Sequence, residues 1–340
     1  MHLKTKLKIL LLIDCNFEAK RGYDFKEELK HDDWSAEKTI LKTLKDLGHN
    51  VSILGLYNKI EPLLEEVVEN KPDVIFNQAD VFKGETHFDK NIASILELFE
   101  IPYTGASPAN LMICNNKALS KKILSYHRIK VPQFYTFYKN RKFKHIKKLK
   151  LPCVVKPLSE EASRGISQAS VVDNETALIE RVKFIHENLG HDAIAEEYID
   201  GREFYVSIIG NKRIQALPLR EMYFGDMPED EPRIATYKAK WDEKYRKKWK
   251  LLNRSVTNLS PELTKKAQDV CKRAYKALNM RCYARMDIRI TPDDIIYIIE
   301  PNANPNLQPL DEFARAAGKA NITYDKLVNK LLKLAFQRND

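Results

Sequence analysis

The run Ala284-Arg285-Met286-Asp287-Ile288-Arg289-Ile290 and the run Ile295-Ile296-Tyr297-Ile298-Ile299-Glu300-Pro301-Asn302 have the apolar, β-branched character of two strands. Thr291-Pro292-Asp293-Asp294 between them is typical of a hairpin turn. A hairpin places its strands side by side, so Asp287 is expected to face Glu300. Carboxylates within apolar runs are costly to bury alone, and a hard divalent cation is a common remedy. The pattern predicts a metal site, with a hairpin whose acids face water as the alternative.

A second candidate site lies in the middle of the chain, where a short β-branched run delivers a lysine. Cys153-Val154-Val155-Lys156-Pro157 is expected to form a strand, followed by a small polar loop and a second strand over 166–172. Such an arrangement places a cation and backbone N–H groups over an anion such as phosphate. The alternative is that Lys156 is a solvated residue at a sheet edge.

Two further segments contribute charged side chains. A strand that begins at Ile194 carries Glu196 and Glu197, and it continues through an Asp-Gly turn into a second strand that carries Glu203. Asn116 precedes a helix expected over 117–126, whose first residue, Lys117, adds another cation.

These segments, taken in chain order, resemble the ATP-grasp superfamily, and within it D-alanine–D-alanine ligase and its relatives. The resemblance extends from about residue 70 to the C-terminus. It includes Ile101-Pro102-Tyr103-Thr104-Gly105, which is typical of the end of the first domain in that family. It implies a three-domain α/β architecture, α+β in its ATP-binding part, in which two antiparallel sheets clamp the nucleotide.

The resemblance also implies a role for each matching residue. The residues expected to bind ATP are Lys117, Lys156 and Lys238 at the phosphates, Ser163 in the lysine loop, Glu196, Glu197, Tyr198 and Ile199 at adenine, and Glu203 at the ribose hydroxyls. The ligands expected for Mg²⁺, with Mn²⁺ as the alternative ion, are Asp287, Glu300 and Asn302. The residues expected to assist catalysis are Lys240 at the γ-phosphate, and Arg285 and the Asn306 N–H at the oxyanion.

The chemistry implied is a two-step ligation. A substrate carboxylate attacks the γ-phosphorus of ATP, which gives an acyl phosphate and ADP, and an amine then attacks the acyl phosphate. Phosphoryl transfer mainly requires positioning and neutralisation of charge, which the lysines and the metal would supply. A closed lid would keep water from hydrolysing the acyl phosphate.

The sequence departs from D-alanine–D-alanine ligases on the substrate side. Those ligases usually have a Gly-rich first loop followed by a glutamate that holds the first amine, whereas this chain has Asp14-Cys15-Asn16-Phe17-Glu18. Their lysine loop carries Gly-Ser-Ser where this chain has Glu161-Ala162-Ser163. Pro305-Asn306 replaces their Pro-Gly, and the following loop is short. The departures predict a substrate other than D-alanine plus D-alanine. The alternative is that other polar groups restore equivalent contacts, namely Glu18, Asp32 or Asp33, and Gln308.

Composition agrees with this interpretation. The 340 residues are enough for two or three domains, and the 44% hydrophobic content is ample for their cores. Neither G-x-x-x-x-G-K-[ST] nor G-x-G-x-x-G occurs. The net charge of +10 favours anionic ligands. Five scattered cysteines without C-x-x-C spacing indicate buried thiols in a reducing compartment, and the first apolar run is too short for a signal peptide. We therefore expect a cytoplasmic protein without membrane spans.

The order of elements predicts three units. Residues 1–112 alternate strands over 9–13, 51–54 and 74–77 with helices such as 35–47, which indicates a parallel sheet. Residues 113–190 form a central ATP-grasp subdomain, with a second helix over 175–189. Residues 191–340 form a C-terminal ATP-grasp subdomain with the metal site, the lid loop and helices near 261–279, 310–317 and 323–336.

Two basic segments allow more than one interpretation. Arg141 to Lys148 is typical of a solvated amphipathic helix. Lys238 to Lys250 has Trp241, Tyr245 and Trp249 at helical spacing, which predicts one aromatic stripe packed on the domain. It is also compatible with a lid over ATP that carries Lys238 and Lys240, or with a nucleic-acid surface.

The function predicted is an ATP-dependent carboxylate–amine ligase, for an amino acid or peptide, that acts on small molecules as a monomer or homodimer. The alternatives are a D-alanine–D-alanine ligase proper, a non-catalytic ATP-binding protein and a nucleic-acid-binding protein. The complete set of metal ligands favours an enzyme.

Overall fold

The computed structural model describes residues 6–141, 149–160, 163–228 and 231–337. The first sheet is parallel and is formed by the N-terminal part of the chain. Its strands are β1 (Lys8–Asp14), β2 (Asn50–Leu56) and β3 (Val74–Gln78), in the order β2-β1-β3. The helices that follow them are α1 (Ser35–Asp46), α2 (Glu61–Asn70) and α3 (Asp89–Leu98). These elements confirm the predicted strands and helix of the first unit.

Side chains along β1 point alternately to the two faces of this sheet, as they do in any strand. Ile9 and Leu11 join the core formed with α1, whereas Leu10 and Leu12 join the core formed with α2 and α3. Burial on both faces explains why β1 is a continuous apolar run.

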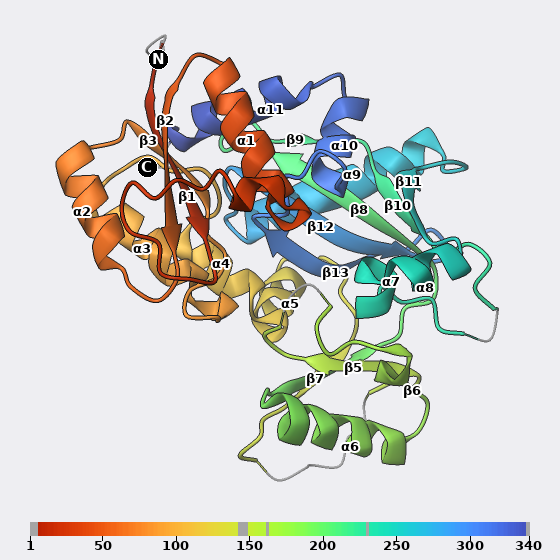
Figure 1. Cartoon of the computed structure of the whole chain (residues 1–340). Helices are drawn as coiled ribbons and strands as arrows, with labels where there is room; N and C mark the ends of the chain where they lie inside the picture. The colour runs from red at the N-terminus through yellow and green to blue at the C-terminus, as the bar shows by residue number, and fades with distance from the viewer. Residues whose placement is uncertain (1–5, 142–148, 161–162, 229–230, 338–340) are drawn as a thin grey trace.

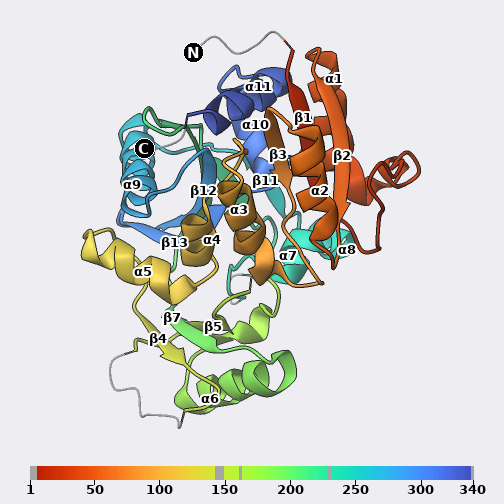
Figure 2. The ribbon, with the colours of Figure 1, turned by 90° about the vertical axis from the view of Figure 1, so that its left-hand side faces the viewer.

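The second sheet is antiparallel and has the order β4-β7-β5-β6. Its strands are β4 (Phe134–Phe137), β5 (Cys153–Pro157), β6 (Val171–Val172) and β7 (Ala193–Glu197). The nearby helices are α4 (Pro108–Cys114), α5 (Lys117–Tyr126) and α6 (Glu175–Phe184). Helix α5 has the predicted bounds, and α6 ends five residues early in a wider turn, Ile185–Leu189. Both views show α6 on the outer face of this sheet (Figure 1, Figure 2).

The predicted strand over 166–172 is wrong for most of its length. Only Val171–Val172 pair with β5, and Gln168–Ser170 form a 3₁₀ turn. The Ser167 N–H donates to the Ser170 hydroxyl at 3.0 Å, and Arg181 donates to that hydroxyl and to the carbonyl of Gly165. Polar side chains thus occupy backbone groups that a strand would pair with its neighbour.

The third sheet is antiparallel and contains the hairpin that the sequence predicts over residues 284–302. Its order is β11-β10-β8-β12-β13, with β9 beside β8. The strands are β8 (Arg202–Ile209), β9 (Gln215–Ala216), β10 (Arg220–Tyr223), β11 (Leu252–Ser255), β12 (Tyr283–Ile290) and β13 (Ile296–Ala303). The helices are α7 (Tyr237–Trp241), α8 (Glu243–Lys248), α9 (Pro261–Ala277), α10 (Glu312–Lys319) and α11 (Tyr324–Ala335).

The two ends of the chain share one hydrophobic core. Residues of β1 and α1 pack with residues of α10 and α11, and Figure 1 shows α11 beside α1. The division of the chain into three units, at residues 112 and 190, remains a prediction.

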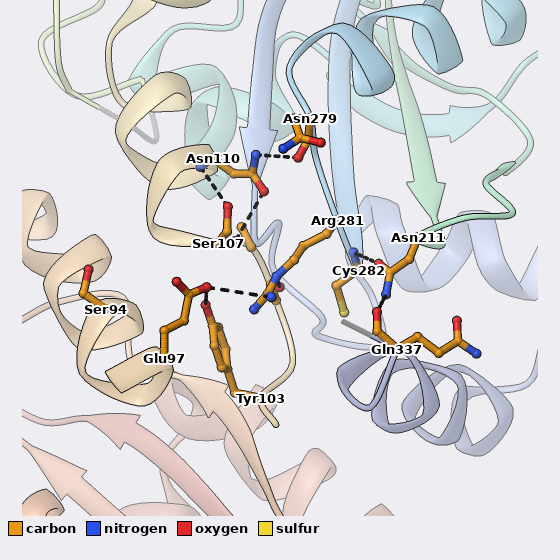
Figure 3. A network of polar contacts seen from close by, with 12 residues as sticks. Ser94, Glu97, Tyr103, Ser107, Asn110, Asn211, Asn279, Arg281, Cys282 and Gln337 are labelled. Atoms are coloured by element: carbon orange, nitrogen blue, oxygen red, sulfur yellow. Dashed lines mark hydrogen bonds and ion pairs between the residues drawn. The ribbon is translucent and has the colours of Figure 1, made fainter. Parts of the chain in front are cut away.

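A polar network joins the first sheet's surroundings to the start of β12. The Asn110 amide donates to the carbonyls of Leu278 and Asn279 at 3.1 and 2.9 Å (Figure 3). Arg281 donates to the Gly105 carbonyl at 3.2 Å and lies 3.8 Å from Glu97. These contacts hold the start of the β12–β13 hairpin against residues 97–110.

The prediction of one aromatic stripe over 238–250 is wrong. The helix breaks at Asp242, whose backbone is extended (ψ 105°) and whose carboxylate accepts from the Tyr245 N–H at 2.9 Å. Tyr245 and Trp249 pack on the core beside β10, whereas Trp241 is 56% exposed. Because the Asp242 cap separates α7 from α8, Trp241 does not lie on the same surface as Tyr245 and Trp249.

Two segments named in the sequence analysis belong to parts of the chain that the structure does not describe. The basic cluster over 142–148 and the loop residues Glu161 and Ala162 lie outside the described residues. No helix among the described residues combines the length and the apolar character that crossing a membrane requires.

Candidate active site

A cleft is lined by residues of the second and third sheets and by Ile234, Ala235 and Lys240 of the segment that leads into α7. Successive side chains of a strand point to opposite faces, so every second residue of the lining strands faces the cleft. Along β12, Met286 and Ile288 are buried in the core under α9, so Asp287 and Arg289 face the cleft. The predicted site residues that line the cleft are Lys156, Ser163, Glu196, Glu197, Tyr198, Ile199, Glu203, Lys240, Asp287 and Glu300.

The hairpin brings the two predicted metal-binding acids together. Asp287 pairs with Glu300 in the β12–β13 register, and Arg285 pairs with Asn302. The prediction that the two acids face each other is therefore confirmed. Asp287 is held by Arg285 through contacts of 2.7 and 3.0 Å, and Glu300 lies 3.0 Å from the Lys117 ammonium.

The two acids differ in their electrostatic surroundings. Burial on its own raises the pKa of a carboxyl group, and for Asp287 this effect outweighs the attraction of Arg285 and Lys240, so its pKa is raised. Glu300 is only partly buried, with its side chain 21% exposed, and the charges of Lys117, Lys156 and Lys240 lower its pKa to about 2. The cleft is thus a cationic environment around one firmly ionised carboxylate.

The residues at the hairpin fit a magnesium ion that is shared with phosphates. No group of three or more His, Cys, Asp or Glu side chains able to hold a metal occurs among the described residues. Mg²⁺ typically takes one or two carboxylates and completes its shell with phosphate oxygens and water. The Asn302 amide nitrogen is buried and finds no hydrogen-bond partner in the described chain. Rotating that amide by half a turn would put an oxygen at this position, on the strand face that Asn302 shares with Glu300 by the two-residue period.

Two buried lysines meet on one glutamate at the floor of the cleft. Glu196 lies 3.0 Å from Lys156 and 3.2 Å from Lys121, and all three side chains are at most 6% exposed. Sequence reasoning missed Lys121. It stands four residues after Lys117 on α5, a spacing that places both on one helical face.

The pKa values of these lysines shift in opposite directions. Burial lowers the pKa of Lys121 to about 8, and the charge of Lys156 adds to this effect. Burial also acts on Lys156, but Glu196 and Glu300 outweigh it and raise its pKa.

We expect Lys121 to make stability depend on pH in alkaline solution. A lysine whose pKa is about 8 in the folded chain and about 10.4 when unfolded destabilises the fold while charged, and this cost fades as pH rises between those values. The unchanged chain should therefore gain stability relative to Lys121→Met between pH 8 and 10, measured by urea unfolding. Lys156→Met is the control, because a lysine with a raised pKa keeps its proton in that window. A flat difference for Lys121→Met would contradict the assignment.

The other end of the cleft contains an ion pair as well as backbone and apolar groups. The Ile199 carbonyl accepts from Arg289 at 2.7 Å, and Glu203 lies 3.0 Å from the same guanidinium. Arg289 also lies under the Tyr198 ring, 5.3 Å from its centre. Arg289 was not predicted, although it shares a strand face with Arg285 and Asp287 by the two-residue period.

The loop after β5 and the segment before α7 are bonded across the cleft. The Ser163 hydroxyl donates to the Ala235 carbonyl at 2.8 Å, and the Tyr237 N–H donates to the Ile166 carbonyl at 3.1 Å. Lys240 lines the cleft, whereas Lys238 is exposed and lies outside its lining. The segment over 234–240, which is the predicted lid, therefore contacts the loop after β5, and one of its two lysines, Lys240, lines the cleft.

Two predicted catalytic residues, Arg285 and Asn306, do not line the cleft. Arg285 is 3.4 Å from Glu312 as well as bonded to Asp287, and its guanidinium lies 4.8 Å from the centre of the Tyr205 ring. Asn306 is exposed, and its side chain accepts from the Gln308 N–H at 2.8 Å. Asn306 lines a separate cavity rather than the cleft itself.

Comparisons with known proteins agree with this geometry. The "D-ala D-ala ligase C-terminus" family matches residues 123–333. A D-alanine–D-alanine ligase of Carboxydothermus hydrogenoformans is 29% identical over 88% of this chain and 91% of its own length. An uncharacterized protein, y4sG, of Sinorhizobium fredii is 28% identical over 88% and 87%. The fold matches the crystal structure of Bacillus anthracis D-alanine–D-alanine ligase complexed with ATP, with a TM-score of 0.74, 22% identity and coverage of 97% and 98%. The chain therefore belongs to the D-alanine–D-alanine ligase family of the ATP-grasp superfamily, whose members are ATP-dependent ligases that form carbon–nitrogen bonds.

Proposed function

We propose that this chain joins a carboxylate to an amine through an acyl phosphate, with release of ADP and phosphate. The observation that carries the proposal is the convergence of Lys117, Lys156 and Lys240 on Glu300, directly opposite Asp287 in the hairpin register. Such a set can neutralise a triphosphate and hold a divalent ion next to it, which is most of what phosphoryl transfer requires.

The nucleotide would lie between the second and third sheets, in line with the proposed division into units. Lys117 and Lys156, now paired with Glu300 and Glu196, would contact the phosphates. Glu197, Tyr198 and Ile199 would surround adenine, and Glu203 would accept from the ribose hydroxyls once Arg289 yields. Mg²⁺ would be held by Asp287, Glu300 and Asn302 and would supply charge neutralisation at the phosphates.

In the first step, a substrate carboxylate oxygen attacks the γ-phosphorus and ADP leaves. Lys240 on the lid is directed inward and is close enough to act electrostatically on both Asp287 and Glu300, so it can stabilise the transferring group. Ser163 keeps the lid shut through its bond to Ala235. A shut lid excludes water, which protects the acyl phosphate from hydrolysis.

In the second step, an amine attacks the acyl carbon and phosphate leaves. Arg285 is buried beside the hairpin end, and Asp287 and Glu312 orient its guanidinium. We propose that it donates to the oxyanion of the tetrahedral intermediate, an interaction often worth about 3–4 kcal/mol. The Asn306 N–H would be a second donor.

The products of nucleotide turnover test this mechanism. With an accepted carboxylate and amine, ATP should yield ADP and phosphate, because attack at the γ-phosphorus leaves the α–β bond intact. A screen of amino acids and small carboxylates, read by nucleotide chromatography and mass spectrometry, would identify both products. AMP and pyrophosphate as the main products would refute the mechanism. A reaction without amine is the control for background hydrolysis.

A D-alanine–D-alanine ligase activity proper is the second candidate, because one relative carries that name. The relative y4sG is uncharacterized and favours neither candidate. Steady-state kinetics with D-alanine decide between them. We expect a kcat/KM well below the ~10⁴ M⁻¹s⁻¹ that is ordinary for enzymes with their own substrates.

A further inference from the structure

The floor of the cleft holds one more positive charge than its buried carboxylate requires. Glu196 places its Oε2 atom 3.0 Å from the Lys156 ammonium and its Oε1 atom 3.2 Å from the Lys121 ammonium. The three side chains are 6% exposed or less. One lysine would balance the carboxylate, and burying a further charge is costly. The second lysine therefore calls for a functional explanation.

Only two of these three side chains face the cleft. Lys156 and Glu196 belong to its lining, whereas Lys121 does not and is 1% exposed. In the described chain, Glu196 Oε1 has no hydrogen bond, so the charge of Lys121 is what balances this oxygen. An effect of Lys121 on a bound nucleotide would therefore be transmitted by Glu196 rather than by direct contact.

Helix α5 and strand β13 hold Lys121 in place independently of Lys156. The Lys121 ammonium donates to the carbonyl of Ile299 on β13. Both views show α5 between the second sheet and β13 (Figure 1, Figure 2). Because this anchor does not involve Lys156, Lys121 can remain beside Glu196 when Lys156 moves.

Lys121 keeps its charge although burial opposes it. Burial lowers the pKa of its ammonium to about 8, so most of it is still charged at pH 7. A methionine of similar length would fill the same space without this cost. Ionisable groups with strongly shifted pKa values cluster at functional sites, and Lys121 is in contact with a residue that lines the cleft.

We infer that Lys121 is a positioning residue for nucleotide binding, which neutralises Glu196 when Lys156 turns from that carboxylate to the phosphates of ATP. The inference rests on the proposed nucleotide site. A buried carboxylate that loses its partner is strongly destabilised, and this cost would oppose the movement of Lys156. With Lys121 in place, Glu196 keeps one partner throughout, and the net positive charge of the group attracts the phosphates.

A purely structural role for Lys121 is the alternative. In that role its ammonium would only join α5 to β13 through the Ile299 carbonyl. Such a contact needs a hydrogen-bond donor but no charge, and it does not depend on the charge of residue 196. The two roles therefore predict different results for neutral substitutions at both positions.

The test measures nucleotide binding by the full chain at pH 7. A non-hydrolysable β,γ-imido analogue of ATP would be titrated calorimetrically in the presence of Mg²⁺. We expect Lys121→Met and Lys121→Gln each to weaken binding by about tenfold or more, because the buried carboxylate then has no partner besides Lys156. Glutamine keeps a donor for the Ile299 carbonyl, so a loss in this variant assigns the effect to the charge. Lys122→Met, at an exposed neighbouring lysine of α5, is the matched control and should bind as the unchanged chain does.

A double variant tests whether Lys121 acts through Glu196. Glutamine at position 196 carries no charge, so in Lys121→Met combined with Glu196→Gln the movement of Lys156 leaves no carboxylate behind. We expect the double variant to bind the analogue at least about fivefold more tightly than Lys121→Met alone. A structural role predicts no such recovery, because α5 would lack its contact with β13 in both variants.

The outcomes separate this inference from the ligase proposal. Analogue binding that neither Lys121 variant weakens, or a loss that Glu196→Gln does not relieve, would overturn the inference even if ADP is released. The expected pattern of binding, without ADP release for any carboxylate and amine, would support the inference and refute ligation. Circular dichroism establishes the fold of each variant. Lys121→Gln, alone and with Glu196→Gln, provides the same comparison if Lys121→Met does not fold.

Discussion

Replacing Glu300 by glutamine or Asp287 by asparagine is expected to abolish turnover, with a loss of roughly 10³-fold or more. A metal-assisted phosphoryl transfer depends on several kcal/mol of charge stabilisation, and each 1.36 kcal/mol is a factor of ten in rate. Glu300 is also the carboxylate on which three lysines converge, with a pKa of about 2. Glutamine in its place removes a metal ligand and leaves those lysines to repel one another.

Initial rates of ADP release on purified variants would measure this effect, with circular dichroism to establish that each variant is folded. Asp293→Asn is the matched control, since Asp293 is an exposed acid in the turn of the same hairpin. Turnover near that of the unchanged chain in both Glu300→Gln and Asp287→Asn would refute the assignment of the metal site. A loss in Asp293→Asn as well would indicate damage to the hairpin rather than to the site.

The second large effect is expected on stability, from Glu196→Ala. Glu196 is the partner of Lys121 and Lys156, and all three side chains are almost wholly buried. Removing one member of a buried ion pair leaves an uncompensated charge and typically costs about 3–5 kcal/mol. Here two ammonium groups would lose their shared partner, so we expect a loss at the upper end of that range, measured by urea unfolding at pH 7.

Glu197→Ala is the control from the same strand. Glu197 is 19% exposed and lies 3.7 Å from Lys150, which is itself 69% exposed. Exposed ion pairs contribute about 0–1 kcal/mol, so this variant should unfold close to the unchanged chain. Similar losses in both variants would mean that the Lys121–Glu196–Lys156 group contributes no more than a surface pair. A compensating Lys121→Met in the Glu196→Ala background should restore part of the stability.

The local elements of the site could be predicted because neighbours in the chain determine them. The β12–β13 hairpin follows from two apolar runs around a turn, and the register that sets Asp287 opposite Glu300 follows from its geometry. The bounds of α5 follow from the cap at Asn116, which accepts from the Leu119 N–H at 3.0 Å. The failures were also local: the Ser167–Ser170 bond ended the strand over 166–172, and the Asp242 cap divided the aromatic helix.

The identity of partners across the cleft required the tertiary structure. Lys121 and Arg289 were overlooked because each gains its role from a residue far along the chain, Glu196 and Glu203 respectively. The cavity that Asn306 lines could not be predicted for the same reason, since it combines the ends of β1 and β3 with the loop after β13 and with Trp241. Sequence by itself determined most of the elements, because hydrogen bonding within turns and the alternation of strands act over a few residues. Only the tertiary structure decided which charges meet, because Coulombic interactions and burial depend on distances between segments that chain spacing does not specify.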